Sequence, residues 1–403
     1  MYRCQLCAGE LTVFLDLGRQ PLSDRFIAPG DPEFTFDMRV GTCTACTMVQ
    51  LTEDPGCDRM FHHDYPYRSA QSVAMREHFE RTAHRLASRY LNNPGASVVE
   101  IGCNDGTTLQ AFDALGIKHL GVEPGGRVAK EAAARGLRVL PEFFDEAVGA
   151  RIRAAEGPAD LIFGANTISH IADLPSVLRG VDRLLASDGV FIFEDPYLLD
   201  VVERTSFDQI IDEHFYLFSA CSVSEIARRH GFELIDLERL PVHGGQIRCT
   251  LARAGTRDRA ASVGATITEE QARGLATPAT LTAFAHRVAR TRDDLVALLT
   301  RLRDEGKHVV GYGATAKSAT LTNYCGIGPD LLSRIHDSTP TKHGLLAPGS
   351  HIPVRPAEEF TSPYPDYALL LAWNHAEEIM QKERAFHDAG GRWILHVPEV
   401  HLV

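Results

Sequence analysis

The sequence predicts an α/β protein with a small metal-binding module at the N-terminus and two nucleotide-fold-like units after it. Three observations predict this arrangement. At 403 residues the chain is too long for one ordinary domain. The first 64 residues are rich in turns and hold two close pairs of cysteines. A strand, a glycine loop and a helical segment follow one another from residue 97 and again from residue 308, which is typical of parallel sheets covered by helices.

Composition restricts the kind of partner. Apolar residues make up 44% of the chain and charged residues 23%, as in ordinary globular proteins. The net charge of −12 opposes nucleic-acid binding, so we expect a small-molecule substrate and no nucleic-acid partner. The apolar runs are too short to cross a membrane, and the first residues lack the pattern of a signal peptide. We therefore expect a cytoplasmic protein with no membrane partner.

The N-terminal module, residues 1–66, carries the cysteine pairs. Cys4 and Cys7 form one C-x-x-C pair, Cys43 and Cys46 form the other, and 35 residues lie between them. Each pair can place two thiolates on one tetrahedral ion, and four cysteines without an open position indicate a structural zinc. A redox pair and unrelated buried thiols are the alternatives.

The central unit, residues 67–255, begins with a predicted helix over 70–91. A second helix is predicted over 174–186, and residues 232–240 and 246–252 predict a pair of extended segments. Apolar runs predict parallel strands at 97–101, 118–122, 137–140, 160–165 and 190–194.

The C-terminal unit, residues 256–403, opens with a stretch over 256–275 that is rich in Ala, Thr and Arg and predicts a linker. A long amphipathic helix is predicted over 278–305. The strands of a second α/β unit are predicted at 308–312, 333–336, 367–372 and 393–397.

The first glycine loop runs from Glu100 through Gly102 to Gly106, directly after a strand. Glycines let a ligand approach the backbone closely. Glu123 ends the next strand about 20 residues further on, where a carboxylate can bind both ribose hydroxyls. This pattern fits a nicotinamide cofactor or S-adenosylmethionine, and the E-x-G-x-x-x-G spacing favours S-adenosylmethionine.

The segment 212–219, Asp-Glu-His-Phe-Tyr-Leu-Phe-Ser, brings an acid, an imidazole and a phenol together soon after the strand at 190–194. Proton-handling groups beyond the C-terminal end of a strand are typical of the reactive edge of an open α/β sheet. The alternative is that Glu213 and His214 are ordinary surface residues.

The second glycine loop, residues 311–318, follows a strand and opens a helix. Backbone amides at a helix start can bind phosphate, and Lys317 adds a positive charge. The alternative is a nucleotide fold without a ligand. Asn323, Asp337, Lys342, His343 and the pair Trp373-Asn374 lie near the expected ligand edge.

Over essentially its whole length the chain resembles the deoxysugar C-methyltransferases, which methylate nucleotide-linked 4-keto sugars. The matching features are the four cysteines, the Tyr-Ser-Met stretch, the loop at 100–106, the Asp-Glu-His-Phe segment, His243-Gly244-Gly245 and the second glycine loop. In the Tyr-Ser-Met stretch Tyr65, Tyr67, Ser69, Ser72 and Met75 match. Gln246 departs from the pattern, because many members carry serine there.

The resemblance implies a class I methyltransferase Rossmann-like domain in the centre and a Rossmann-like domain that holds the sugar nucleotide at the C-terminus. It implies S-adenosylmethionine and zinc as cofactors, and transfer to C3 of a dTDP-linked 4-keto deoxysugar. His214 is implied as the base with a pKa near 7, Glu213 as its partner or as the alternative base, and His170, Tyr216 and Tyr67 as donors to the enolate. Residues implied to bind the cofactor are Glu100, Gly102, Asn104, Asp105, Gly106, Glu123, Asn166, Ser72 and Met75. Residues implied to bind the sugar nucleotide are Tyr65, Tyr67, His243, Gly244, Gly311, Lys317, Asn323, Lys342 and Asn374.

Other functions stay open at the level of sequence. They are a zinc-knuckle RNA methyltransferase, a sugar-nucleotide enzyme that methylates C5, a nicotinamide oxidoreductase that uses the second glycine loop, and a sugar-nucleotide binding protein without catalysis. We expect a monomer or a weak homo-oligomer.

Overall fold

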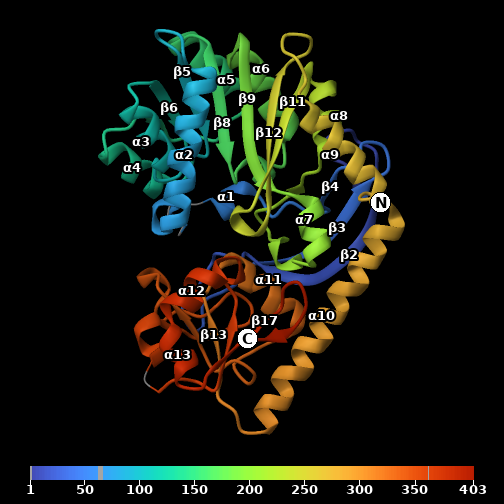
Figure 1. Cartoon of the computed structure of the whole chain (residues 1–403), viewed down its shortest axis with the longest axis vertical. Helices are drawn as coiled ribbons and strands as arrows, with labels where there is room; N and C mark the ends of the chain where they lie inside the picture. The colour runs from blue at the N-terminus through green and yellow to red at the C-terminus, as the bar shows by residue number, and fades with distance from the viewer. Residues whose placement is uncertain (1, 62–66, 362) are drawn as a thin grey trace.

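The computed structural model describes residues 2–61, 67–361 and 363–403 and contains three sheets (Figure 1). The strand orders are β1-β2-β3-β4-β10, β11-β12-β9-β8-β5-β6-β7 and β15-β14-β13-β16-β17-β18. The predicted fold class is confirmed: a zinc-binding module and two Rossmann-like α/β units. Among the described residues, no helix combines the length and the apolar character that crossing a membrane requires.

The N-terminal sheet is antiparallel and takes its last strand from the middle of the chain. Its first four strands are β1 (Tyr2–Arg3), β2 (Glu10–Pro21), β3 (Thr35–Cys43) and β4 (Val49–Leu51), and a short helix α1 (Cys57–Met60) follows them. The fifth strand is β10 (Tyr216–Leu217), which pairs with β4. The segment that carries His214 is therefore held by the zinc-binding module.

Five neighbouring strands of the central sheet, in the spatial order β7-β6-β5-β8-β9, are parallel. Its strands are β5 (Ser97–Ile101), β6 (Lys118–Val122), β7 (Val139–Leu140), β8 (Ala159–Ala165) and β9 (Leu185–Pro196). The antiparallel strands β11 (Phe232–Leu240) and β12 (Gln246–Arg253) complete it, with β12 between β9 and β11. This pair matches the predicted extended segments.

Helices cover both faces of the central sheet because its strand residues alternate between two cores. On β9, Phe191 and Phe193 join one cluster, whereas Val190 and Ile192 join the other. The helices of this part are α2 (Val73–Tyr90), α3 (Thr107–Ala114), α4 (Gly126–Ala134), α5 (Glu146–Glu156), α6 (Leu174–Leu184), α7 (Leu198–Arg204) and α8 (Ala220–Arg229). Short 3-10 turns are η1 (Ser69–Gln71), η2 (Ile168–His170), η3 (Phe207–Gln209) and η4 (Val242–Gly244).

The stretch predicted as a linker is largely a helix, so that prediction was wrong. Helix α9 (Ala261–Ala272) packs against α8 and β11 of the central unit. Glu270 of this helix, which is 1% exposed, bonds it to the central unit. This carboxylate accepts hydrogen bonds from the Tyr197 hydroxyl at 2.9 Å and from the backbone amides of Ala220 and Cys221 at 2.6 and 2.9 Å. It thereby satisfies amides at the start of α8 that lack a partner within the helix.

Replacing Glu270 with alanine is expected to lower the free energy of unfolding by about 3 kcal/mol, because three buried donors lose a charged acceptor. Urea titration measures this change. Glu269→Ala is the matched control, because its half-exposed side chain only faces Arg273 one turn away. That control is expected to change stability by less than about 0.5 kcal/mol. Equal effects of the two substitutions would contradict the role given to Glu270.

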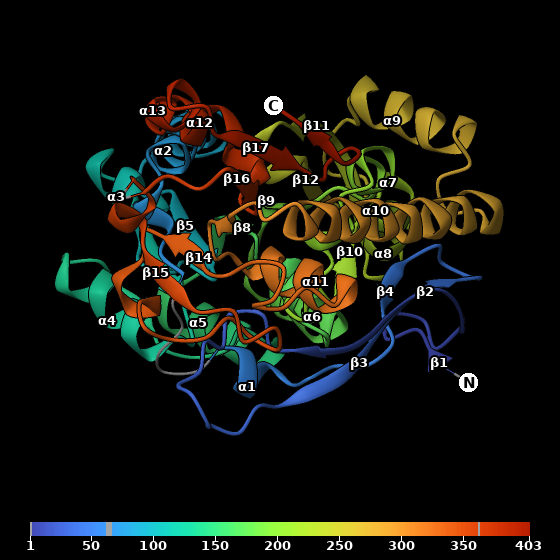
Figure 2. The same cartoon turned by 90° about the horizontal axis from the view of Figure 1, so that it is seen from below.

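A 27-residue helix, α10 (Pro278–Asp304), leads to the C-terminal unit along one side of the molecule (Figures 1 and 2). It begins at the N-cap Thr277, whose hydroxyl accepts from the amide of Thr280. It buries a stripe of apolar residues that includes Leu281, Val288 and Leu295, and it packs partly on β2.

The C-terminal sheet is parallel except at its last strand. Its strands are β13 (Val309–Tyr312), β14 (Ile335–Asp337), β15 (Val354–Pro356), β16 (Tyr367–Leu370), β17 (Arg392–Leu395) and β18 (His401–Leu402). Its helices are α11 (Ala316–Cys325), α12 (Ala376–Lys382) and α13 (Arg384–Asp388), with 3-10 turns η5 (Pro340–Lys342), η6 (Ala357–Thr361) and η7 (Trp373–His375). Helix α11 contacts both β2 and η3, so this unit touches both other parts.

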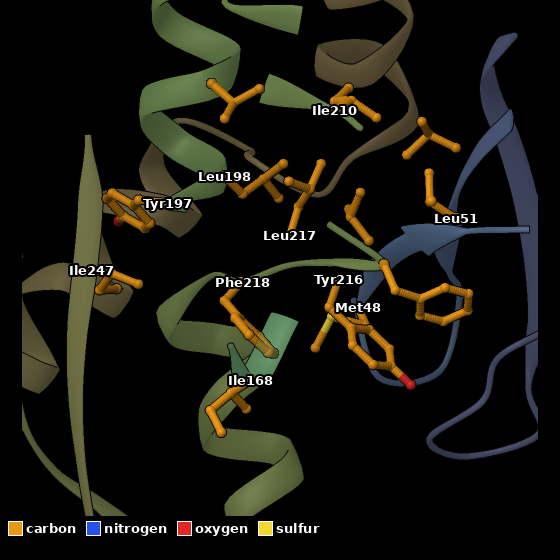
Figure 3. Close-up of a cluster of buried hydrophobic side chains, with 14 of the residues drawn as sticks. Met48, Leu51, Ile168, Tyr197, Leu198, Ile210, Tyr216, Leu217, Phe218 and Ile247 are labelled. Carbon is orange, nitrogen blue, oxygen red and sulfur yellow. The ribbon is translucent and has the colours of Figure 1, made fainter. Parts of the chain in front are cut away.

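One hydrophobic cluster joins the zinc-binding module to the central unit (Figure 3). Met48 and Leu51 enter it from the module, whereas Leu217 and Phe218 enter it from the segment after His214. All four side chains are at most 2% exposed. The segment that holds the proposed base is therefore fixed in a packed core rather than carried on a free surface loop.

Candidate active site

The four cysteines of the N-terminal module form the metal site. Their sulfurs all lie within 4.8 Å of one another. Cys4 Sγ is 3.6 Å from Cys46 Sγ, and Cys7 Sγ is 3.4 Å from Cys43 Sγ. A tetrahedral ion with Zn–S bonds of about 2.3 Å places its sulfurs about 3.8 Å apart, so the set fits zinc with no open position. The predicted structural zinc site is confirmed.

The two cysteine pairs have the same backbone form. Ala8 and Thr47, each one residue beyond its pair, adopt left-handed φ values of 56° and 58°. The amide of Cys4 donates to the Gly9 carbonyl, and the amide of Cys43 donates to the Met48 carbonyl. At Gly9 a Cβ would lie 3.0 Å from Cys43 Sγ, so this position leaves room for the sulfurs.

The first cavity, of about 90 Å³, lies at the carboxyl ends of β5, β6 and β8. Gly102, at φ 70°, packs so closely on Thr167 that any Cβ there would clash. Glu123 accepts hydrogen bonds from the amides of Asn104 at 2.9 Å and Gly125 at 2.7 Å. Burial raises the pKa of this carboxyl. Predicted cofactor residues that line the cavity are Gly102, Asn104, Glu123 and Asn166, and apolar walls come from Phe61, Phe79, Phe143 and Phe144.

The other predicted cofactor residues do not line this cavity, and their binding roles stay predictions. Asp105 accepts from the Thr107 hydroxyl at 2.6 Å and from the Ala70 amide at 3.1 Å, which ties the loop to η1. Glu100 is 3% exposed, and burial raises its pKa well above the usual value. Gly106 serves as the left-handed N-cap of α3. Ser72, the N-cap of α2, and Met75 face the second cavity instead.

The second cavity, of about 400 Å³, lies between the central and C-terminal units, and Asp24 of the N-terminal module also lines it. Tyr67, Asn166 and His170 line both cavities, so the two spaces adjoin. Other predicted site residues on its wall are Glu213, His214, His243, Lys317, Lys342 and Asn374.

His214 presents one ring nitrogen for proton transfer. Its Nδ1 lies 2.5 Å from the Gln209 carbonyl oxygen, which can only accept, so Nδ1 carries the proton and Nε2 is the basic nitrogen. Burial, together with the positive charge of Lys317, lowers the pKa of His214 to about 4, although the hydrogen bond to the Gln209 carbonyl acts in the opposite direction. The expected pKa near 7 is therefore not found in the unliganded chain, where the imidazole is neutral at pH 7.

His170 lies between His214 and Phe61. Its ring stacks on Phe61 at 5.5 Å between centroids and 5° between planes, and it lies 5.2 Å from the His214 ring. Glu213 Oε2 is 4.0 Å from its Nδ1. Burial lowers the pKa of His170 well below the usual value, so this imidazole is also neutral. Its buried Nε2 has no hydrogen-bond partner within the described ranges.

The two tyrosines that were predicted as enolate donors differ in their placement. The Tyr216 hydroxyl donates to the Ala172 carbonyl at 2.6 Å, inside the core beside the zinc-binding module, and it lines neither cavity. Its role as a catalytic residue stays a prediction, one that this placement does not support. Tyr67 lines both cavities and is 37% exposed. Tyr65 lies outside the described residues.

The C-terminal unit contributes positive charge to the wall of the second cavity. Lys317 lies in the first turn of α11, and burial lowers its pKa. The Lys342 ammonium donates to the Ala314 carbonyl at 2.7 Å and lies 4.7 Å from the Phe26 ring centre. His243 adopts a left-handed φ of 52°, and burial lowers its pKa well below the usual value.

Three residues predicted to bind the sugar nucleotide lie away from the cavity wall. Asn323 donates to the carbonyls of Ala319 and Pro348. Gly311 lies within β13, and Gly244 packs against the Trp373 ring. Their roles in binding the sugar nucleotide stay predictions.

Cavity residues that sequence reasoning missed include Asp24, Gln209 and His375. His375 directly follows Asn374, so extending that motif by one residue would have found it. Asp24 and Gln209 carry no motif and reach the cavity only through the packing of distant segments.

Comparison with known proteins gives the same three parts. Family profiles described as a zinc binding domain, a methyltransferase domain and a C-methyltransferase C-terminal domain match residues 4–61, 74–237 and 241–398. The predicted boundaries at residues 66 and 255 stay predictions. A dimethylglycine N-methyltransferase of Parasynechococcus marenigrum is 37% identical over 62 residues, which cover 15% of this chain and 22% of that protein. The solved structure of the PH0226 protein of Pyrococcus horikoshii covers 49% of this chain and all of its own, at 15% identity and a TM-score of 0.39.

A further relative spans the whole chain. C-methyltransferase NovU of Streptomyces niveus is 34% identical over 406 aligned residues, which cover 99% of this chain and 96% of that protein. The residues of the first cavity and the four-cysteine cluster fit the two cofactors, S-adenosylmethionine and zinc. The chain therefore belongs to the C-methyltransferase family and is an S-adenosylmethionine-dependent C-methyltransferase with a structural zinc.

Proposed function

We propose that this enzyme methylates C3 of a dTDP-linked 4-keto deoxysugar, in deoxysugar and antibiotic biosynthesis. The observation that carries the proposal is the pair of adjoining cavities with a tautomer-fixed imidazole in the second. Tyr67, Asn166 and His170 line both spaces, and His214 Nε2 belongs to the second. The resemblance to deoxysugar C-methyltransferases supports the substrate class.

Proton removal is the task we assign to His214. A carbon next to a ketone becomes acidic when the oxygen of its enolate is stabilised. His214 Nε2 takes the proton of that carbon, while the Gln209 carbonyl keeps Nδ1 protonated and holds the ring in place. His170, with a buried Nε2 that lacks a partner in the described part of the chain, donates to the ketone oxygen. Glu213, whose Oε2 lies 4.0 Å from His170 Nδ1, is the alternative base on the same cavity wall.

Holding the methyl donor is the task of the first cavity. When bound, S-adenosylmethionine supplies an electrophilic methyl group. Glu123 is placed to exchange its bonds to backbone amides for bonds to ribose hydroxyls. The Gly102 backbone allows close approach, and the phenylalanine walls exclude water.

Holding the diphosphate is the task of the C-terminal unit. The first turn of α11 offers free amides with positive dipole charge, and Lys317 and Lys342 add full charges nearby. Thr315 Oγ1 is buried there without a hydrogen-bond partner among the described residues. A diphosphate at this end leaves the sugar ring directed toward His214, on the wall of the same cavity.

The pH dependence follows from the pKa of His214. Only the neutral imidazole takes a proton, and its pKa is lowered to about 4. We expect kcat/KM to stay flat down to about pH 5 and to fall at lower pH, since this parameter reports the free enzyme. We expect the acid limb of kcat to lie at higher pH, because a diphosphate beside Lys317 offsets the charge that lowers the pKa of His214. Initial rates across pH measure both limbs, and an acid limb of kcat/KM near the ordinary histidine value of about 6.5 would contradict the assignment.

The proposed substrate is tested by incubating the enzyme with methyl-labelled S-adenosylmethionine and a panel of 4-keto sugar nucleotides. NMR of the product locates the new carbon–carbon bond, which we expect at C3. A new bond at C5 would show that the enzyme methylates C5 instead of C3. Transfer of the label to RNA alone would overturn the proposal.

A further inference from the structure

Gln246 has a buried side chain with no role in the steps proposed so far. It neither transfers the proton nor holds the methyl donor or the diphosphate. It is the first residue of β12, opposite Pro196 of β9, and it lines the second cavity. It is 1% exposed. Its side-chain nitrogen donates to Asn166 Oδ1, while its own oxygen Oε1 is buried and has no hydrogen-bond partner in the parts of the chain that the structure describes. A buried amide oxygen without a partner destabilises the fold unless a ligand satisfies it.

The pair of amides is held rigidly from both sides. Asn166 follows β8 with a left-handed φ of 51°, and its backbone amide donates to the Glu194 carbonyl at 2.7 Å. Gln246 is fixed by the antiparallel pairing of β12 with β9 and β11. The free oxygen is therefore positioned before any ligand enters.

The position of this pair relates it to the reacting carbon. Asn166 lines both cavities, and Gln246, its partner, lines the second. The carbon that receives the methyl group must sit where the two cavities meet, since the group passes from one to the other. His214 and His170 line the second cavity as well, on the segments 212–219 and 168–170. Because its partner Asn166 lines both cavities, Gln246 lies close to the place where they meet.

We propose that Gln246 is a specificity-determining residue whose side-chain oxygen accepts a hydrogen bond from a hydroxyl or amine group on the methylated carbon. This inference rests on the proposed function. The group it binds is not consumed, because the proton lost from that carbon goes to His214 and the new bond forms at the carbon itself. A sugar with only hydrogen atoms at this carbon would leave the buried oxygen unpaired, which is the kind of defect that separates substrates strongly.

The test compares two 4-keto sugar nucleotides that differ only at the acceptor carbon, one with a hydroxyl group and one with hydrogen. We expect the wild-type enzyme to prefer the hydroxyl-bearing substrate by about 10²-fold or more in kcat/KM. Gln246→Met keeps the length and volume of the side chain and removes both amide groups. It is expected to reduce the preference to less than about threefold, mainly through slower methylation of the hydroxyl-bearing sugar.

Matched variants separate recognition from folding. Gln246→Glu keeps an oxygen acceptor and is expected to retain most of the preference. Gln50→Met removes another amide that is 1% exposed, in β4 and outside both cavities, and is expected to leave the preference intact. If Gln246→Met fails to fold, Gln246→Ser replaces it, because a serine side chain is too short to bring an oxygen to the same place. Calorimetric binding of S-adenosylmethionine verifies that each variant retains the first cavity.

The outcomes distinguish this inference from the proposed function. If the wild-type enzyme methylates no 4-keto sugar nucleotide, the proposed function fails and this inference falls with it. If the wild-type enzyme methylates both sugars equally, or if Gln246→Met keeps the preference, the proposed function stands and the role of Gln246 is overturned. A preference for an acceptor-only group such as a methoxy substituent would overturn it as well.

Discussion

Replacing His214 with asparagine is expected to lower methyl transfer by about 10²- to 10⁴-fold, the usual contribution of a general base. The side-chain amide of asparagine can still donate to the Gln209 carbonyl, which holds Nδ1 of the native ring. It offers no basic nitrogen in place of Nε2. Binding of both ligands is therefore expected to persist while turnover falls. Rates of label transfer and calorimetric titrations of each ligand measure the two effects separately.

Exchange of the sugar proton with solvent deuterium tests proton removal by His214 more directly, in the same variant. With native enzyme in D₂O we expect deuterium to enter the sugar at the carbon next to the ketone, and with His214→Asn we expect that exchange to stop. His336→Asn is the matched control. His336 is 2% exposed and contacts the Pro356 carbonyl through Nδ1 at 3.0 Å, but it lines neither cavity. Deuterium exchange that persists in His214→Asn would move proton removal to Glu213.

Elements that depend on local pattern were predictable from the sequence. Apolar runs between glycine loops placed β5, β6, β8 and β13 within a residue or two, since strands buried on both faces need continuous apolar stretches. The predicted helix over 174–186 is shorter in the structure, because Leu185 is extended and begins β9. Helix α9 was missed because Glu270 fastens it through partners 50 and 73 residues away, which no local pattern records.

In the candidate site, too, only residues marked by a local sequence pattern could be predicted. Spacing alone identified the four cysteines, and the glycine loops identified Gly102 and Lys317. Tyr216 follows His214 by two residues, but its hydroxyl donates to the Ala172 carbonyl in the core, so nearness in sequence did not place both side chains on one cavity wall. Gln209 fixes the tautomer of His214 and could not be predicted, because that role belongs to its backbone carbonyl rather than to its side chain.

The zinc site supports the catalytic segment through a short chain of contacts. Cys43 ends β3, and β3 pairs with β4. Strand β4 pairs in turn with β10, and the Leu51 amide donates to the Phe215 carbonyl, one residue after His214. Loss of the ion is therefore expected to loosen the segment that carries the base as well as the module itself.

Replacing Cys43 with serine is expected to remove the bound zinc, about one ion per chain, and to lower the free energy of unfolding by about 4–5 kcal/mol or more, as loss of a structural metal does. Metal analysis and urea titration measure the two changes. Cys57→Ser is the matched control, since Cys57 is exposed and lies outside the four-cysteine cluster, and it is expected to change stability by less than about 0.5 kcal/mol. The zinc has no open position for a substrate. The rate of methyl transfer per folded molecule of Cys43→Ser should therefore fall by a smaller factor than the folding equilibrium constant does. Native protein without zinc, or a Cys43→Ser variant as stable as Cys57→Ser, would contradict a structural metal at this site.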